Sequence, residues 1–190
     1  MHWRTVALVG LLAGLVVLGG CSETEATLHV TPLDSGDGLD AVFTTTADLD
    51  PANRDAFRDA IYGYDTGADD GGRIDPGIYL ANDSVYRVTG TDPLDATRLS
   101  DEPAAWYLDR HRSAVADLTG LSAASRQLFA DAIEEGHYLG SASRDDWQGL
   151  RSRIESTPPV RTTDTDAIHL VEYEGTVSVA RIWPSDPRSA

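Results

Sequence analysis

The sequence has 190 residues but no lysine, one cysteine and one methionine. A single cysteine excludes a disulfide within the chain. The 31 acidic side chains outnumber the 15 arginines and give a net charge of −16, so phosphate groups are repelled, which disfavours a surface that binds nucleic acid or anionic lipid. The hydrophobic share of 41% is enough for a real core, which excludes a fully disordered chain. The sequence therefore predicts one acidic, folded domain.

The kind of charge is as informative as its amount. Aspartate outnumbers glutamate by 23 to 8, and every basic residue is arginine. Short carboxylates hold hydrated cations and keep a chain soluble where salt screens repulsion, since the Debye length falls to about 3 Å at 1 M. This lysine-free, Asp-rich composition resembles that of proteins from halophilic archaea, and the resemblance implies a fold that needs salt. The alternative explanation is a GC-rich genome that favours Arg and Asp codons together.

The first twenty residues have the pattern of a signal peptide. Arg4 is followed by an uncharged stretch at positions 6–20, which as a helix spans about 22 Å and is shorter than the ~30 Å core of a bilayer. The stretch ends in Leu-Gly-Gly-Cys at 18–21, which resembles the lipobox of prokaryotic lipoproteins. A plain secretory signal cleaved nearby and an uncleaved short anchor are the alternatives.

The lipobox resemblance implies a place for the mature protein. Cleavage after residue 20 would leave Cys21 as a lipid-bearing N-terminus on the outer face of the cell membrane, joined to the domain by a polar tether at 21–27. A twin-arginine signal is not matched, since the leader holds one arginine, so the general secretory route is favoured and the route stays open. We expect the folded domain to cover residues 28–186.

Two segments of the chain match each other at a constant offset of 72 residues. Positions 49–61 (LDPANRDAFRDAI) and 121–133 (LSAASRQLFADAI) share seven of thirteen residues. Asp50 and Ser122 are N-cap candidates, and Gly63 and Gly136 supply helix stops. The match predicts a duplicated helix. The alternative is two unrelated amphipathic helices that share common residues.

Each predicted helix is followed by a hairpin pattern. The first runs over 78–88 with a turn at Asn82-Asp83, and the second over 168–182 with a turn at Glu174-Gly175. We expect an α+β fold in which the two hairpins join into one antiparallel sheet with helices packed on one face. The pattern predicts a pseudo-twofold repeat with halves at about 28–95 and 100–186. Segments 28–30 and 41–45 are candidate edge strands.

Two further helices are predicted in the second half of the chain. Apolar residues at helical spacing mark 101–118, and a second helix at 144–155 ends before Pro158-Pro159. The tryptophans at 106, 147 and 183 fit core or helix–sheet contacts. An exposed aromatic binding platform is the alternative for them.

An Asp-rich segment at 65–75 invites comparison with calcium sites, because hard cations prefer clustered oxygen ligands. The EF-hand frame fails: with Asp65 as the first ligand, Asp70 stands where the sharp turn needs glycine and Pro76 at the twelfth position. A solvated turn is the expected structure. A protein organised by cations at this segment is the alternative.

Little else in the sequence carries chemistry. His29, His111, His137 and His169 are scattered, and the chain has no His-Glu-x-x-His motif, no Gly-x-Ser-x-Gly elbow and no Gly-rich phosphate loop. We therefore predict no catalytic residue, no metal site and no cofactor. The alternative, an extracellular hydrolase, would need His111 or His137 within hydrogen-bond reach of a serine and an aspartate.

Asn82-Asp83-Ser84 matches the glycosylation sequon and falls on a predicted turn, which makes Asn82 a candidate glycosylation site. Taken together, the chain resembles cell-surface lipoproteins of haloarchaea. The resemblance implies a non-enzymatic binding or structural module of the cell envelope, attached to membrane lipid through Cys21, with an envelope protein as its candidate partner.

Overall fold

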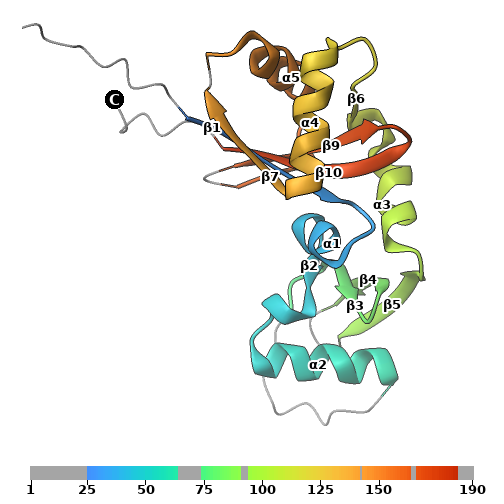
Figure 1. Ribbon diagram of the computed structural model, residues 1–190. Helices are drawn as coiled ribbons and strands as arrows, with labels where there is room; N and C mark the ends of the chain where they lie inside the picture. Colours follow the sequence, from blue (N-terminus) through green and yellow to red (C-terminus); the bar gives the residue numbers. More distant parts are fainter. Residues whose placement is uncertain (1–24, 64–73, 91–93, 142, 164–165, 184–190) are drawn as a thin grey trace, which may run out of the picture.

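The structure is a computed structural model and describes residues 25–63, 74–90, 94–141, 143–163 and 166–183 (Figure 1). The helices are α1 (Gly36–Val42), α2 (Pro51–Tyr62), α3 (Pro103–His111), α4 (Ala123–Glu135) and α5 (Asp145–Glu155). The strands are β1 (Glu25–Pro32), β2 (Thr44–Thr45), β3 (Gly77–Ala81), β4 (Ser84–Thr89), β5 (Asp95–Ser100), β6 (Val115–Asp117), β7 (His137–Ser141), β8 (Arg161–Thr162), β9 (Ala167–Tyr173) and β10 (Thr176–Trp183). Within these ranges the fold is mixed α/β with two sheets.

The larger sheet, here called sheet A, has the order β6-β9-β10-β1-β7, with β8 added beside β9. All its pairs are antiparallel except β6 with β9. The turn between β9 and β10 is formed by Glu174 and Gly175, which both have left-handed backbone angles (φ 51° and 81°). Two such residues give the tight turn whose twist matches that of the strands.

Helices α4 and α5 cover one face of sheet A (Figure 1). Alternate residues of the central strands point toward them, because successive side chains of a strand face opposite sides. Phe129, Trp147 and Ile154 of the two helices are at most 1% exposed against Leu28 of β1 and Val171 of β9. This layer is the main hydrophobic core.

The smaller sheet, sheet B, has the order β2-β3-β4-β5. Its strands β3 and β4 form a hairpin through Asn82 and Asp83, which have φ of 46° and 56°. Phe57 of α2 packs against Tyr79 and Tyr86 on one face, with ring centroids 5.6 and 5.9 Å apart. Helix α2 therefore closes the end of the molecule that lies away from sheet A (Figure 1).

Helices α1 and α3 fill the space between the two sheets. Phe43 and Tyr107 meet edge to face there at 5.1 Å, and both belong to a core that includes Leu80 of β3 and Leu170 of β9. The same apolar cluster thus joins sheet B to the face of sheet A that α4 and α5 leave free. The resulting order of layers is α4 and α5, sheet A, α1 and α3, sheet B, α2.

The predicted single antiparallel sheet with helices on one face is wrong. Both hairpins form at the expected turns, but β3 and β4 lie in sheet B whereas β9 and β10 lie in sheet A. Both sheets also contain a parallel pair, β2 with β3 and β6 with β9. Helices lie on both faces of sheet A. The two hairpins pair with other strands and not with each other, because the unpaired edge of a strand can form hydrogen bonds with any strand that lies beside it.

The predicted helix at 101–118 is correct only in its first part. Helix α3 ends at His111, a 3-10 turn covers Arg112–Ala114, and β6 begins at Val115. The burial of Ala114, Ala116 and Leu118 alternates with more exposed neighbours, which is the period of a strand. Ala114 and Leu118 are also four residues apart, which fits the helical stripe of the preceding residues, so the pattern alone does not separate helix from strand.

The predicted edge strands also differ from the structure. Residues 28–30 belong to β1, which is central in sheet A between β10 and β7 and joins strands of the second half of the chain. Segment 41–45 is divided between α1 and the short β2, and β2 is an edge strand of sheet B as predicted. Among the described residues, no helix is both long enough and apolar enough to cross a membrane.

Candidate functional site

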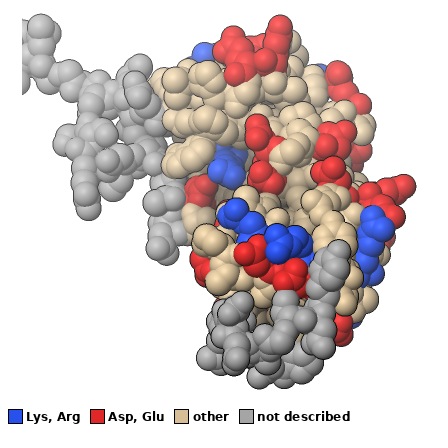
Figure 2. Space-filling model, turned by 90° about the horizontal axis from the view of Figure 1, so that it is seen from below, with Lys and Arg blue, Asp and Glu red and all other residues tan. Residues whose placement is uncertain are grey.

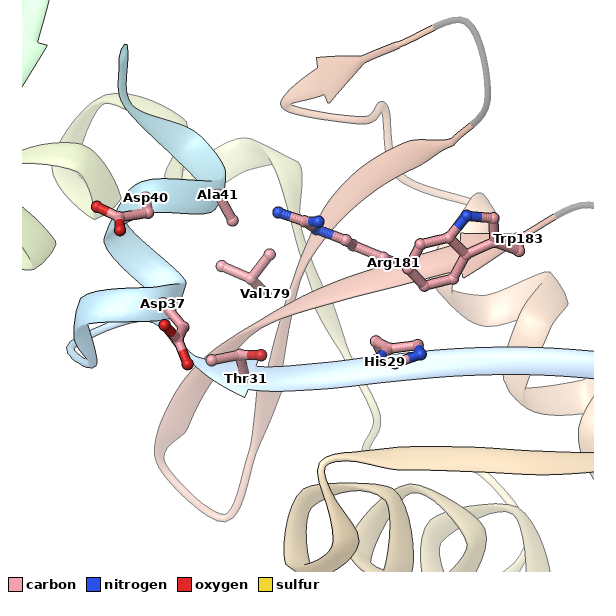
Figure 3. A pocket seen from close by; sticks show the side chains of 8 residues that line it. All are labelled: His29, Thr31, Asp37, Asp40, Ala41, Val179, Arg181 and Trp183. Carbon is pink, nitrogen blue, oxygen red and sulfur yellow. The ribbon is translucent and has the colours of Figure 1, made fainter. Parts of the chain in front are cut away.

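A hollow of about 320 Å³ lies where α1 meets the free face of sheet A (Figure 3). Strands β1 and β10 form its floor and α1 forms one wall. Its lining residues are His29, Thr31, Asp37, Asp40, Ala41, Val179, Arg181 and Trp183. It combines charges of both signs with aromatic rings, which is what a site that fixes a polar ligand needs.

Strand geometry explains why these side chains gather. In β1, Leu28 and Val30 point into the core under α4 and α5, so His29 and Thr31 point to the opposite face. In β10, Ala180 and Ile182 are buried in the same core, which directs Arg181 and Trp183 to the hollow. The antiparallel register then sets His29 directly opposite Arg181.

Arg181 is the side chain that sets the charge of the floor. It is half-buried and extends over the sheet toward α1, with Ala41 and Val179 beside it (Figure 3). No acidic side chain of the described residues forms an ion pair with its guanidinium, although 5 such pairs occur elsewhere in the structure. A guanidinium in this position has its donors available for an incoming acceptor.

His29 lines the hollow and also contacts His137, which lies outside it. Its ring stacks on His137 at a centroid distance of 5.8 Å and meets the edge of Trp183 at 4.7 Å. Burial lowers the pKa of His29, and the nearby charges of His137 and Arg181 lower it further. Because its pKa is lowered, the imidazole of His29 is mainly neutral near neutral pH. The ring therefore adds polarity and stacking surface but little charge.

Asp37 and Asp40 bring negative charge to the opposite wall. Both lie on α1 and are exposed (Figure 3). Helix α1 starts at Gly36 because the hydroxyl of Ser35 accepts a hydrogen bond from the backbone N–H of Gly38 at 3.0 Å. Gly38 approaches the carbonyl of Pro32 so closely that no β-carbon would fit there. The acidic wall and the arginine floor are therefore held on separate, rigid elements.

The residues predicted from the sequence fall in different places. Cys21 and most of the Asp-rich segment at 65–75 lie outside the described residues. Asn82 is exposed in the β3–β4 turn, where the sequon was expected. The hydroxyl of Ser84, the third residue of the sequon, is buried and accepts a hydrogen bond from Nη2 of Arg98 at 2.8 Å.

The described histidines do not assemble a catalytic group with serine. His111 stacks on Tyr107 at 4.3 Å, and Nδ1 of His137 lies 3.2 Å from the backbone oxygen of Glu135. His169 is buried beneath α5, and its Nδ1 has no partner within the described ranges. Over that same part of the chain, no three His, Cys, Asp or Glu side chains gather as metal ligands. The hydrolase alternative therefore gains no support from these rings.

The tryptophans divide between core and surface. Trp147 is 1% exposed beneath α4, and Trp106 packs in the core between the sheets with the guanidinium of Arg110 3.7 Å above its ring. Both match the core interpretation. Trp183 instead lines the hollow, half-buried on the free face of sheet A. On this face of sheet A, the aromatic surface of the described residues consists of Trp183 and its histidine neighbours.

Sequence reasoning missed Arg181, Thr31 and the aspartates of α1 as site residues. The available signal was the alternation around Arg181, where the buried Ala180 and Ile182 flank a charged residue. It could not be used without the pairing of β1 with β10, whose residues lie about 150 positions apart in the sequence. Comparisons of the chain with protein-family models, with curated proteins and with solved structures returned no match.

Proposed function

We propose that the chain is a lipoprotein of a halophilic archaeal cell surface, anchored in the membrane through Cys21, and that its domain is a non-enzymatic binding module. The spacing between Cys21 and the fold carries the proposal. Only three residues separate Cys21 from β1, and β1 begins beside the end of β10, where Thr27 pairs with Trp183. An anchor on this short tether would hold one defined end of sheet A toward the membrane.

The anchoring is tested by expressing the tagged chain in a haloarchaeal host. We expect membrane-bound protein whose first residue is Cys21, with an added lipid mass on that residue. Cys21→Ser is the matched control and should lose both the lipid mass and the membrane fraction. Protein recovered from the cytosol with Met1 and an unmodified thiol would overturn the proposal.

Arg181 supports binding as the role of the domain. A half-buried guanidinium on the floor of a hollow, with two acidic residues in the lining, suits a partner that presents its own charged or polar groups. An envelope protein is the partner that we propose. No histidine–serine pair of the described residues offers the nucleophile and base of a hydrolase.

Binding is tested by placing a photoreactive residue at Asp40, on the rim of the hollow, and irradiating intact cells. We expect a discrete crosslinked product that disappears when Arg181→Met is added. The same residue placed at Arg58, which is exposed on α2, is the control for non-specific capture. Equal products from both positions would contradict a binding role for the hollow.

We also propose that α2 and α4 descend from one duplicated segment. Both helices have an N-cap side chain that accepts from the backbone three residues on, Asp50 and Ser122, and both end at a left-handed glycine. The proposal covers the helices and their caps; the strands that follow them lie in different sheets.

A further inference from the structure

One part of sheet A is covered by no element of the described chain. It is formed by five residues on the face opposite α4 and α5: Thr27, His29, His137, Leu139 and Trp183, here called the open patch. The register places Leu139, Thr27 and Trp183 in one row across three strands and His137 beside His29 in the next. Helix α1 covers only a neighbouring part of this face, beside Thr31 and Val179.

The open patch contrasts with the rest of the surface. The chain has a net charge of −16, yet Figure 2 shows a stretch of uncharged surface with basic and acidic groups at its border. Leu139 is 62% exposed, and with Tyr62 it makes up the exposed large hydrophobic side chains of the described residues. The two histidines stack on each other, and Arg181 lies at the margin of the patch. An uncharged, partly apolar face on such an acidic protein indicates a contact surface.

The open patch lies at the end of sheet A from which the chain leaves toward Cys21. Four residue steps join Cys21 to Glu25, which at about 3.5 Å each limits their separation to about 14 Å. Thr27, in the outer row of the patch, follows two residues later. A lipid on Cys21 would therefore keep Leu139 and Trp183 within reach of the bilayer surface.

We propose that the open patch docks on the lipid surface of the membrane that holds the anchor, with Leu139 and Trp183 in contact with the interfacial region. This inference rests on the lipid attachment proposed above. Tryptophan favours the membrane interface, where its ring meets apolar chains and its N–H stays hydrated. Because the anchor already confines the domain to the bilayer, a small contact suffices to orient it.

A second copy of the chain fits the patch less well. A stable protein–protein interface uses about 20–30 residues on each side, whereas the open patch has five. A lipid surface needs no shaped counterpart, and molar salt reduces its repulsion of the acidic domain to a range of about 3 Å.

The test uses the mature chain from Cys21 to Ala190, coupled through Cys21, the only thiol, to a maleimide phospholipid in vesicles. The vesicles contain diether phosphatidylglycerol and a bromine-labelled phosphatidylcholine in molar NaCl. Bromine quenches tryptophan fluorescence at short range, so Trp183 should be quenched. Trp183→Phe leaves the signal of the buried Trp147 and of the half-buried Trp106, which packs between the two sheets, and should lose most of the quenching.

Leu139→Asp should at least halve the quenching of Trp183, because it sets a carboxylate against the bilayer. Tyr62→Asp is the matched control: it adds the same charge at a side chain of similar exposure, 57%, on α2 at the far end of the molecule. It should leave the quenching unchanged. Circular dichroism of each variant confirms folding, which is expected because both side chains are mostly exposed.

Two results would overturn the inference. The first is no quenching of Trp183 in the coupled protein, whether or not chemical crosslinking then detects dimers. The second is equal quenching in the wild type, Leu139→Asp and Tyr62→Asp. Because the lipid is attached chemically, both results are independent of natural lipidation at Cys21. A missing lipid in cells would contradict the proposed anchoring alone.

Discussion

His169 is the deepest of the described histidines, 3% exposed on the face of sheet A that α5 covers. Burial lowers its pKa, while Glu155 and a hydrogen bond with the backbone of Thr157 raise it in part. The net direction is down, so the folded state favours the neutral ring. An unfolded chain would take up the proton more readily, near the ordinary pKa of about 6.5.

The lowered pKa of His169 determines how its contribution to stability depends on pH. The contribution of His169 is fully present above the unfolded pKa and is lost as the pH falls below it toward the lowered folded value. We expect the free energy of unfolding to fall between pH 7.5 and 5.5, and to fall less in His169→Gln. Denaturant titrations at fixed NaCl measure both. An unchanged pH profile in the variant would contradict the lowered pKa.

Trp147 and Trp106, the two tryptophans that pack in the hydrophobic core, differ in how far they are buried. Trp147→Ala should reduce the free energy of unfolding by about 3–5 kcal/mol, because the ring is fully enclosed between α4, α5 and sheet A. Trp106→Ala should cost less, since that ring is half-buried and part of its surroundings is the exposed guanidinium of Arg110. Chemical denaturation of both variants provides the comparison, and equal losses would contradict it.

At the scale of the elements, helix ends offer a direct measurement. The side chains of Asp50 and Ser122 each accept a backbone N–H at 3.0 Å, from Asn53 and Ser125. Asp50→Ala and Ser122→Ala should each destabilise the fold by about 1 kcal/mol, because an N–H in the first turn loses its acceptor. Unfolding midpoints at constant salt test this.

The matched control for the caps is Asp55→Ala, which removes an exposed ion pair with Arg58 and leaves the helix start intact. Surface pairs of this kind contribute at most about 1 kcal/mol and often nothing measurable. A larger effect at Asp55 than at both caps would mean that surface charge, and not capping, stabilises these helices.

Local elements were largely predictable from the sequence. The helices α2, α4 and α5 and both hairpin turns are where the caps, the apolar spacing and the turn residues indicate. The wrong predictions were those that depend on contacts between residues far apart in the sequence. Nothing near Leu28 indicates that its strand becomes central, since its neighbours β10 and β7 come from the other end of the chain.

Short strands and the residues of the hollow could not be predicted, for related reasons. Strand β7 has five residues, among them His137 and Gly140, and carries no strand pattern that could be recognised. Arg181 resembles any surface arginine until β10 is placed beside β1 and α1 is folded over both. Among the site residues only His29 and Trp183 were singled out, and the residues around them were unknown until the sheet was assembled.

At the scale of the whole molecule, the acidic surface governs the response to salt. A net charge of −16 without a lysine means strong self-repulsion at low ionic strength. We expect the unfolding midpoint to rise with NaCl into the molar range. Thermal unfolding at several NaCl concentrations measures this, with sucrose as a control for general exclusion effects. A midpoint that is flat or falls would favour the codon-bias explanation of the composition.

The two ends of the described chain lie at one end of sheet A, and α2 lies at the other end of the molecule (Figure 1). On an anchored protein this polarity decides what the environment meets first. A dissolved molecule that approaches from the medium would meet α4 and α5, which cover the face of sheet A opposite the open patch. The hollow beside Arg181, deeper in the stack, would instead be reached sideways by neighbours that diffuse in the plane of the same bilayer.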